Sequence, residues 1–274
     1  MMKIAAYRGW TSLVSVLWLM ACSSSSQLPI RDEEVAALPA HRARLVGNAI
    51  QEWQSWGRIT LHGWPNLRES EPDPAMFDKI LAYWTSVPGE GPAIIRRHQA
   101  LRDALAESQD VAGAASASAS ISLWAWPAWS AAFISHQMAA SGVPSFVFPP
   151  SASHAAYVDV LLAEVQQTGT AAAFAAHHPA DYVPRPGDLL CSDRSLYPLL
   201  HWQDRIADAG QFRPMHCDIV VAARGGTVHV IGGNVLDVVA LRIFPADDAG
   251  RVLPAPWDKP PFFLVLENRL DEVP

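Results

Sequence analysis

The C-terminal third of the chain is a series of short apolar segments of strand length, separated by turn residues. These segments cover residues 187–191, 216–223, 227–235, 238–244 and 262–267. A Gly-Gly pair at 225–226 separates two of them and is typical of a β-hairpin turn. Segments with helical spacing precede the strands, at about 129–138 and 154–167. Helices followed by a run of antiparallel strands predict an α+β domain.

The first residues have the pattern of a secretory leader. Lys3 and Arg8 give a positive start, and an apolar run follows from 13 to 21. The run is shorter than the roughly 20 apolar residues of a transmembrane helix, but its length suits a secretory signal. It ends in Leu19-Met20-Ala21-Cys22, which resembles the lipobox of bacterial lipoproteins.

The lipobox resemblance implies that the leader is cleaved before Cys22 and that this cysteine carries lipid. Two or more acyl chains make membrane attachment stable. Ser23, rather than an aspartate, follows the cysteine, as in lipoproteins sorted to the outer membrane. We therefore expect a lipid-anchored protein in the cell envelope, on the periplasmic face of the outer membrane. The alternative is an ordinary cleaved leader with a chance cysteine.

The expected organisation has five parts. Residues 1–21 form the leader and 22–30 a serine-rich tether. Residues 31–112 have apolar residues at helical spacing and form a helical region. An Ala/Ser linker at 113–120 leads to an α+β domain at 121–274. The helical region is either a separate subdomain or a cap, and we favour a cap because only a short linker joins it to the next domain.

The chain has three cysteines, and acylation of Cys22 would leave Cys191 and Cys217. An even pair in an oxidising periplasm favours a disulfide between them. The alternatives are two buried free thiols or a thiol nucleophile. For Cys191, the neighbouring Arg194 adds the alternative of a reactive thiolate.

The composition argues against several classes of partner. The chain has 27 Asp and Glu against 20 Lys and Arg, a formal charge of −7. This balance argues against nucleic-acid binding. Neither a His-Glu-x-x-His motif nor a paired-cysteine zinc spacing occurs in the sequence, so we expect no metal and no cofactor. The sequence does not indicate an oligomeric state.

Four motifs carry a resemblance to known enzymes. The segment 127–136 resembles the nucleophile helix of CHAP and NlpC-type amidases and peptidases, with Ser130 where those enzymes have cysteine. Residues 184–189 resemble their first core strand, 216–221 the strand with the catalytic histidine, and 231–235 the strand whose polar residue orients it. The order implies a papain-like fold. The whole pattern, over about 121–270, is similar to a bacterial family called domain of unknown function 2272.

The resemblance implies catalytic roles for Ser130, His216 and Asn234. A serine hydroxyl is too weak an acid to ionise at a helix start, so it needs a general base, for which His216 is the candidate. Asn234 would fix the tautomer of that histidine. Each residue also has a simpler interpretation: Ser130 as a helix N-cap, His216 as a buried histidine bonded to backbone, and Asn234 as a turn residue.

Strand alternation adds a test of these roles. His216 and Asp218 should share one face of their strand, and Cys217 should lie on the other. A three-residue hairpin loop would place His216 opposite Asn234, whereas a two-residue loop would place Cys217 there. The sequence leaves both registers open, although a slip of one residue would separate the proposed pair.

Trp126, Trp129 and Asp188 are the candidate substrate-binding residues, with core packing as the other interpretation of the tryptophans. His154, near Tyr157, could line the cleft, but its place at a helix start favours the surface. The resulting hypothesis is an amidase or peptidase that acts on peptidoglycan peptides. The alternatives are an inactive papain-like domain that binds wall fragments or a partner protein, and a purely structural envelope protein.

Overall fold

A computed structural model describes residues 29–64, 74–107 and 126–272. The expected leader, the lipidation site Cys22 and most of the tether lie outside these residues, as does the 113–120 linker. Within the described ranges, none of the helices combines the length and the apolar character needed to span a membrane.

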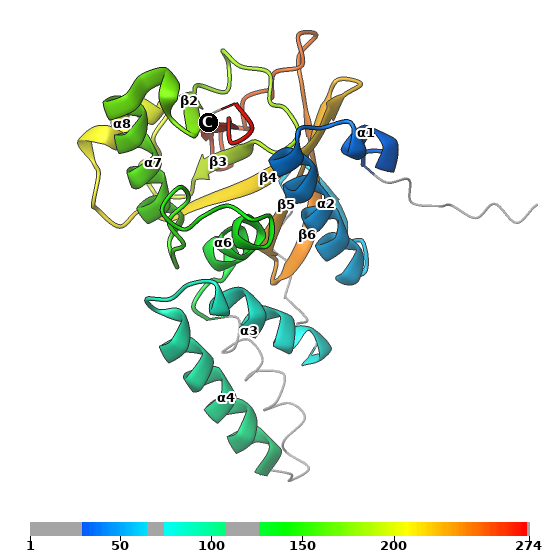
Figure 1. The fold of residues 1–274 in the computed structure, drawn as a ribbon, viewed down its shortest axis with the longest axis vertical. Helices are drawn as coiled ribbons and strands as arrows, with labels where there is room; N and C mark the ends of the chain where they lie inside the picture. The colour runs from blue at the N-terminus through cyan, green and yellow to red at the C-terminus, as the bar shows by residue number, and fades with distance from the viewer. Residues whose placement is uncertain (1–28, 65–73, 108–125, 273–274) are drawn as a thin grey trace, which may run out of the picture.

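The described chain folds into one mixed sheet covered by helices (Figure 1). The helices are α1 (Asp32–Ala36), α2 (Ala40–Ser55), α3 (Phe77–Thr85), α4 (Gly91–Glu107), α6 (Ser130–Ala140), α7 (His154–Thr168) and α8 (Trp202–Ala207), with 3-10 turns η1 (Pro74–Met76) and η2 (Gly169–Ala171). The strands are β1 (Thr60–His62), β2 (Phe174–His177), β3 (Leu189–Asp193), β4 (Met215–Arg224), β5 (Thr227–Val235), β6 (Val238–Pro245) and β7 (Phe262–Asn268).

The sheet has seven strands in the order β1-β6-β5-β4-β3-β7-β2. Its strands pair antiparallel, except that β1 runs parallel to β6. The predicted α+β class is therefore confirmed. The predicted antiparallel sheet of the C-terminal domain is found in β2 to β7. The whole sheet is mixed, because β1, a strand of three residues from the N-terminal region, joins its edge in parallel.

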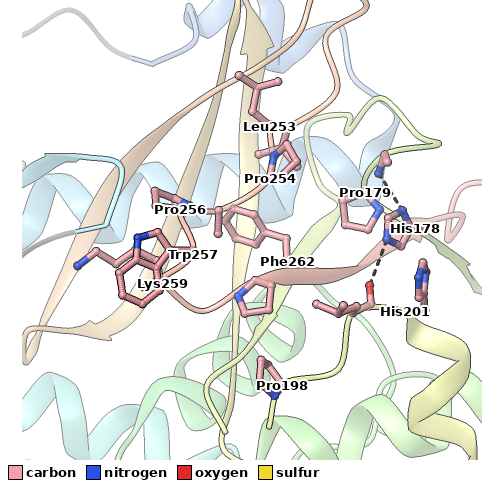
Figure 2. Close-up of a pocket in the computed structure, with 15 residues that line it drawn as sticks. His178, Pro179, Pro198, His201, Leu253, Pro254, Pro256, Trp257, Lys259 and Phe262 are labelled. Atoms are coloured by element: carbon pink, nitrogen blue, oxygen red, sulfur yellow. Dashed lines mark hydrogen bonds between the residues drawn. The ribbon is translucent and has the colours of Figure 1, made fainter. Parts of the chain in front are cut away.

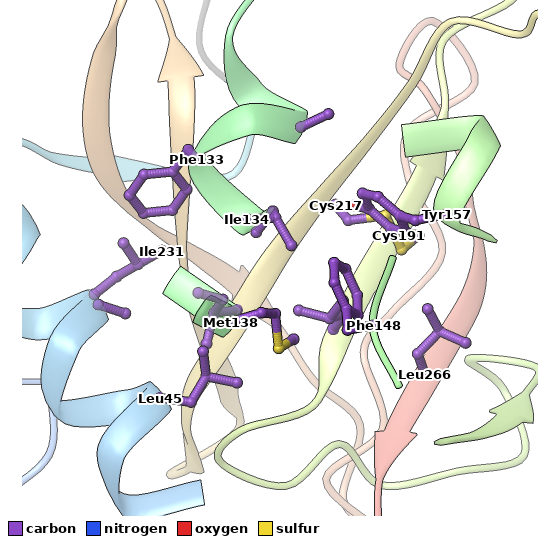
Figure 3. Close-up of a cluster of buried hydrophobic side chains, with 14 of the residues drawn as sticks. Leu45, Phe133, Ile134, Met138, Phe148, Tyr157, Cys191, Cys217, Ile231 and Leu266 are labelled. Carbon is purple, nitrogen blue, oxygen red and sulfur yellow. A yellow bond between two sulfur atoms is a disulfide. The ribbon is translucent and has the colours of Figure 1, made fainter. Parts of the chain in front are cut away.

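The main core lies between this sheet and helices α2, α6 and α7, which cover one of its faces (Figures 1 and 3). Phe133, Ile134 and Met138 of α6 point into this core, and Ile231 of β5 faces them from the sheet. A smaller apolar cluster on the other face includes Val220 and Phe244. Strand alternation explains the division, because odd and even positions of β4 and β5 point to opposite faces.

The Cys191–Cys217 disulfide is present, as predicted (Figure 3). The two cysteines are direct partners in the ladder between β3 and β4, with their Cα atoms 4.1 Å apart. Both are fully buried in the main core, so neither is available as a thiol nucleophile.

The N-terminal region contributes to the same core as the strands. Arg42 of α2 forms a buried ion pair of 2.8 Å with Asp188, just before β3. Tyr83 and Trp84 of α3 are buried against α6, while α4 packs on the outer side of α3 (Figure 1). The region expected to be helical thus contributes strand β1 to the sheet. It also contributes helix α2, which the Arg42–Asp188 ion pair attaches to the segment before β3.

The β4–β5 hairpin combines features of both expected registers. Arg224 pairs with Thr227, which leaves a two-residue Gly-Gly loop. A β-bulge at Val221 then shifts the pairing by one residue, so that Ile219 pairs with Ile231. Beyond the bulge the register is the one expected for a three-residue loop. The β4–β5 ladder ends at this pair.

Candidate functional site

Ser130 is the first residue of α6 and is 7% exposed. The N-cap position belongs to Trp129, and no side chain caps the helix there, so Ser130 is not its N-cap. Its Oγ instead lies 2.7 Å from Nε2 of His154. Trp129 is wedged between Trp56 and Tyr83, at ring-centroid distances of 5.5 and 5.4 Å, and this packing fixes the start of the helix.

His154 is the first residue of α7 and is only 5% exposed. The expected surface position is therefore wrong. Its Nδ1 is 2.5 Å from the hydroxyl of Tyr157, one helical turn later, so both ring nitrogens have a partner. Burial, and then the charge of His216, lowers the pKa of His154, while Asp218 opposes the shift. The imidazole is therefore neutral at pH 7.

Tyr157 keeps its proton at neutral pH. It is fully buried, and burial together with the charge of Asp218 raises its pKa well above the ordinary value. The phenol can donate to His154 Nδ1 or accept from it. When it accepts, His154 carries its proton on Nδ1 and its Nε2 can take the proton of Ser130, as a general base must.

His216 and Asp218 lie on one face of β4, as alternation predicts, and interact directly. Nε2 of His216 is 3.0 Å from Oδ1 of Asp218, and the other carboxylate oxygen accepts a hydrogen bond from Arg242 of β6. Burial alone would raise the pKa of Asp218, but Arg242 and His216 outweigh it and the pKa is lowered. The carboxylate is therefore ionised and orients the histidine.

The second ring nitrogen of His216 is unpaired in the part of the chain that the structure describes. Nδ1 is buried and has no hydrogen-bond partner among the described residues. Because Nε2 donates to the ionised Asp218, Nδ1 has a free lone pair in the neutral ring. Burial lowers the pKa of His216 despite Asp218, which keeps the ring neutral at pH 7. Its ring centroid lies 5.4 Å from that of His154, so the two neutral imidazoles are neighbours, but the hydrogen bond to Ser130 comes from His154 and not from His216.

Two consecutive glycines of β5 permit this close arrangement. A Cβ on Gly232 would lie 1.9 Å from Oδ1 of Asp218, and a Cβ on Gly233 would lie 2.5 Å from Phe133 of α6. Any larger residue at either position would displace one of these groups. The Gly-Gly pair therefore lets β5 lie against the His216–Asp218 pair on one side and α6 on the other.

Asn234 follows the glycines in a left-handed backbone conformation, with φ of 58°. In the amide orientation that satisfies both of its groups, Nδ2 donates to Asp237 at 2.8 Å and Oδ1 accepts from the backbone N–H of Trp129 at 3.1 Å. Asn234 thus holds the backbone just before Ser130. The residue that orients His216 in this structure is Asp218.

A cavity of about 310 Å³ opens beside these residues. His216 and Asn234 line it together with Trp64 and the cationic residues Arg194, Arg242 and Lys259. A second cavity, of about 360 Å³, shares Lys259 with the first (Figure 2). Prolines and the exposed Trp257 form much of its wall. Lys259, in the segment before β7, thus belongs to the walls of both a charged and an apolar cavity.

The three candidate substrate-binding residues have different surroundings. Asp188 is fully buried, pairs with Arg42 and accepts hydrogen bonds from Tyr182 and from backbone N–H groups, so it supports the fold. Trp129 is fully buried in the core. Trp126 is 63% exposed.

Sequence patterns alone did not assign a role to three residues of this cluster, Asp218, His154 and Tyr157. Asp218 was expected on the face of His216 but without a role, although its spacing of two residues along a strand was a usable signal. His154 and Tyr157, three residues apart on a helix, also share a face. Within the described residues, no group of three or more His, Cys, Asp or Glu side chains could hold a metal ion.

The fold and site define an α+β protein with a buried serine–histidine pair at the start of two helices. One family model, described as "Uncharacterized protein conserved in bacteria (DUF2272)", matches residues 73–266. The match covers more than half of the chain, so the chain belongs to this family. Searches of curated proteins and of solved structures each found no match. The matched range includes α3 and α4 as well as most of the sheet.

Proposed function

We propose that this protein is a serine hydrolase with a papain-like scaffold, which cleaves amide bonds in peptidoglycan peptides. The observation that carries the proposal is the 2.7 Å contact between Oγ of Ser130 and Nε2 of His154 at the start of α6. A hydroxyl hydrogen-bonded to a neutral imidazole at a helix N-terminus is the arrangement that activates a serine nucleophile.

In the proposed acylation, Oγ of Ser130 attacks the carbonyl carbon of the scissile amide while its proton passes to Nε2 of His154. The C–N bond then breaks, and His154 returns the proton to the leaving amine. The first backbone N–H groups of α6 have no intrahelical acceptor, and the helix dipole favours negative charge there. These groups are assigned to the oxyanion of the tetrahedral intermediate.

The resulting ester is hydrolysed by water. Nδ1 of His216 has no partner among the described residues, and His216 lines the cavity, so it is assigned to take a proton from this water. The water oxygen bonds to the acyl carbon, the bond to Ser130 breaks, and the proton returns to the serine. His216 thus keeps the role of a base, oriented by Asp218, while Asn234 positions the backbone before the nucleophile.

A papain-like scaffold is supported by a helix that starts at the nucleophile and packs on a largely antiparallel sheet with a histidine strand. The chain departs from the CHAP and NlpC-type pattern in having serine for cysteine, and in the histidine of α7 that contacts it. The proposed location is the periplasmic face of the outer membrane, with a lipid on Cys22, where wall peptides are within reach.

The alternative is a papain-like domain that binds wall fragments or a partner protein without cleaving them. One tautomer of His154, set by its hydrogen bond with Tyr157, favours this binding alternative. If the phenol donates to Nδ1, then Nε2 carries the proton and donates to Ser130, and the hydroxyl is not activated. In that case the three residues would only stabilise the junction of α6 and α7.

Digestion of muropeptides tests the proposed activity. The full chain, purified in mild detergent, is incubated with muropeptides, and the products are identified by mass spectrometry. We expect peptide fragments from the parent protein, and a loss of at least about 10³-fold in rate for Ser130→Ala and for His154→Ala. His216→Ala should accumulate acylated enzyme, because its proposed role lies in deacylation.

Ser145→Ala and His62→Ala are the matched controls, since both side chains are exposed and lie outside the cluster. Both should retain the rate of the parent. A parent protein that binds muropeptides and releases no fragment favours the binding alternative. Cleavage that persists in Ser130→Ala contradicts the assignment of the nucleophile.

A further inference from the structure

The cavity beside His216 is cationic in a chain whose formal charge is −7. Arg194, Arg242 and Lys259 line it, and Asp258 is the only acidic residue among its lining groups. Asp258 pairs with Lys259 at 3.1 Å. Asp218, which is not among the lining residues, pairs with Arg242. Arg194 has no carboxylate within ion-pair distance in the described part of the chain, which leaves the cavity with one unbalanced positive charge.

Arg242 supplies a buried hydrogen-bond donor in the wall of this cavity. It is 7% exposed, and its Nε has no hydrogen-bond partner among the described residues although it is buried. Buried guanidinium donors are normally satisfied, and an unsatisfied one in a cavity wall indicates a missing acceptor. Nη2 of this guanidinium donates to Asp218, so Nε is among the donors left for a ligand.

Arg194 and Arg242 both line the cavity, and their positive charges repel each other. Arg194 is an exposed residue, yet nearby atoms partly desolvate its guanidinium, and this, followed by the positive charge of Arg242, lowers its pKa, while Asp218 opposes the shift. An anion bound between the two cations would relieve this repulsion. Arginine is well suited to such binding, because its planar fork of N–H donors matches two oxygens at once.

We propose that this cavity binds a carboxylate of the peptide substrate, with Arg194 and Nε of Arg242 as the donors. A carboxylate has a single negative charge, which balances the one unpaired arginine. A phosphate dianion would leave one negative charge unbalanced. Because His216 lines the same cavity, we place the carboxylate on the part of the substrate that faces His216. The inference rests on the proposed hydrolase only for the statement that the ligand is its substrate.

A pair of matched peptides tests the inference separately from catalysis. The full chain carrying Ser130→Ala is titrated with N-acetylated tetra-alanine, either as the free acid or as the C-terminal amide, and binding is followed by ligand-observed NMR. We expect the free acid to bind at least tenfold more tightly than the amide. Adding Arg194→Gln should remove this preference and leave the affinity for the amide unchanged.

Arg102→Gln serves as the control. Arg102 lies on the distant helix α4 and pairs with Asp78 of α3, so its substitution should not affect the preference. Equal affinity for the two peptides, including no measurable binding of either, overturns the inference. So does stronger competition by inorganic phosphate than by acetate. A clear preference for the acid in a chain that does not cleave muropeptides would uphold the carboxylate site while contradicting the proposed hydrolase.

Discussion

His154 and His216, near the hydroxyl of Ser130, are placed so that burial determines their protonation states. Both histidines are almost inaccessible, and burial lowers the pKa of each below its usual value of 6.5. Asp218 opposes this shift, while Arg194 and, for His216, Arg242 reinforce it. Both imidazoles are therefore neutral at pH 7, which is the state that the proposed bases require.

The lowered histidine pKa values predict how stability depends on pH. Below pH 6.5 the unfolded chain takes up protons that the buried neutral histidines do not, so the free energy of unfolding falls as the pH falls. Each such histidine should cost up to about 1.4 kcal/mol per pH unit below 6.5. Urea unfolding at pH 7.5 and 5.5 measures the loss.

His154→Gln should reduce this loss, because it removes one of the histidines whose pKa is lowered while leaving a polar side chain at the start of α7. His62→Gln, at an exposed position, should leave the loss unchanged. A parent protein that is equally stable at the two pH values would contradict the assignment of neutral, buried histidines.

Strand alternation was enough to predict that His216 and Asp218 share a face and that Cys217 points away from them. The contact between Ser130 and His154 could not be predicted from the sequence. It depends on how the first residues of α6 and α7, 24 positions apart in the chain, meet in space. Amphipathic spacing indicates which face of a helix is buried. It does not indicate which neighbouring helix end that face meets.

At the scale of elements, the β4–β5 hairpin positions the site through its bulge and its glycines. The sequence could not decide between two registers, because both left an apolar face. The structure uses the short loop and then a bulge at Val221, so each expected register applies to one part of the hairpin. A bulge has no reliable signature in a run of valines and alanines.

Gly232→Ala tests the role of the glycine pair. The new Cβ would lie 1.9 Å from Asp218 Oδ1, so the carboxylate or the strand must move. We predict a loss of about 1–3 kcal/mol in the free energy of unfolding. We also expect a loss of activity larger than this change in folding would cause, since His216 loses its orienting partner. Denaturant unfolding and muropeptide cleavage measure the two effects.

Gly47→Ala is the matched control for this substitution. Gly47 lies inside α2 with open space around it, so alanine there should stabilise the protein by about 0.5–1 kcal/mol. If Gly232→Ala were as harmless as Gly47→Ala, the close approach of β5 to Asp218 would be wrong.

At the scale of the whole molecule, the N-terminal region is joined to the strands by a buried ion pair. Arg42 of α2 reaches Asp188 and also donates to the backbone carbonyls of Pro186 and Asn268. Burial raises the pKa of Asp188 in spite of Arg42 and its hydrogen-bond donors. The sequence predicted the helices of this region, but not β1, which is too short and too exposed to give a strand pattern.

Arg42→Met should be strongly destabilising, because it leaves the carboxylate of Asp188 buried without its cation. We predict a loss of about 3–5 kcal/mol in the free energy of unfolding at pH 7. The double variant Arg42→Met with Asp188→Asn should be less destabilised than Arg42→Met alone. Equal losses in the two proteins would indicate that the pair does not tie α2 to the sheet.

Covalent labelling of Ser130 tests the proposed nucleophile most directly. The full chain is treated with a fluorophosphonate probe, digested, and mapped by mass spectrometry. We predict an adduct on Ser130 in the parent and in Ser145→Ala, no adduct in Ser130→Ala, and strongly reduced labelling in His154→Ala. Absence of labelling in the parent, or an adduct on a different serine, would contradict an activated hydroxyl at the start of α6.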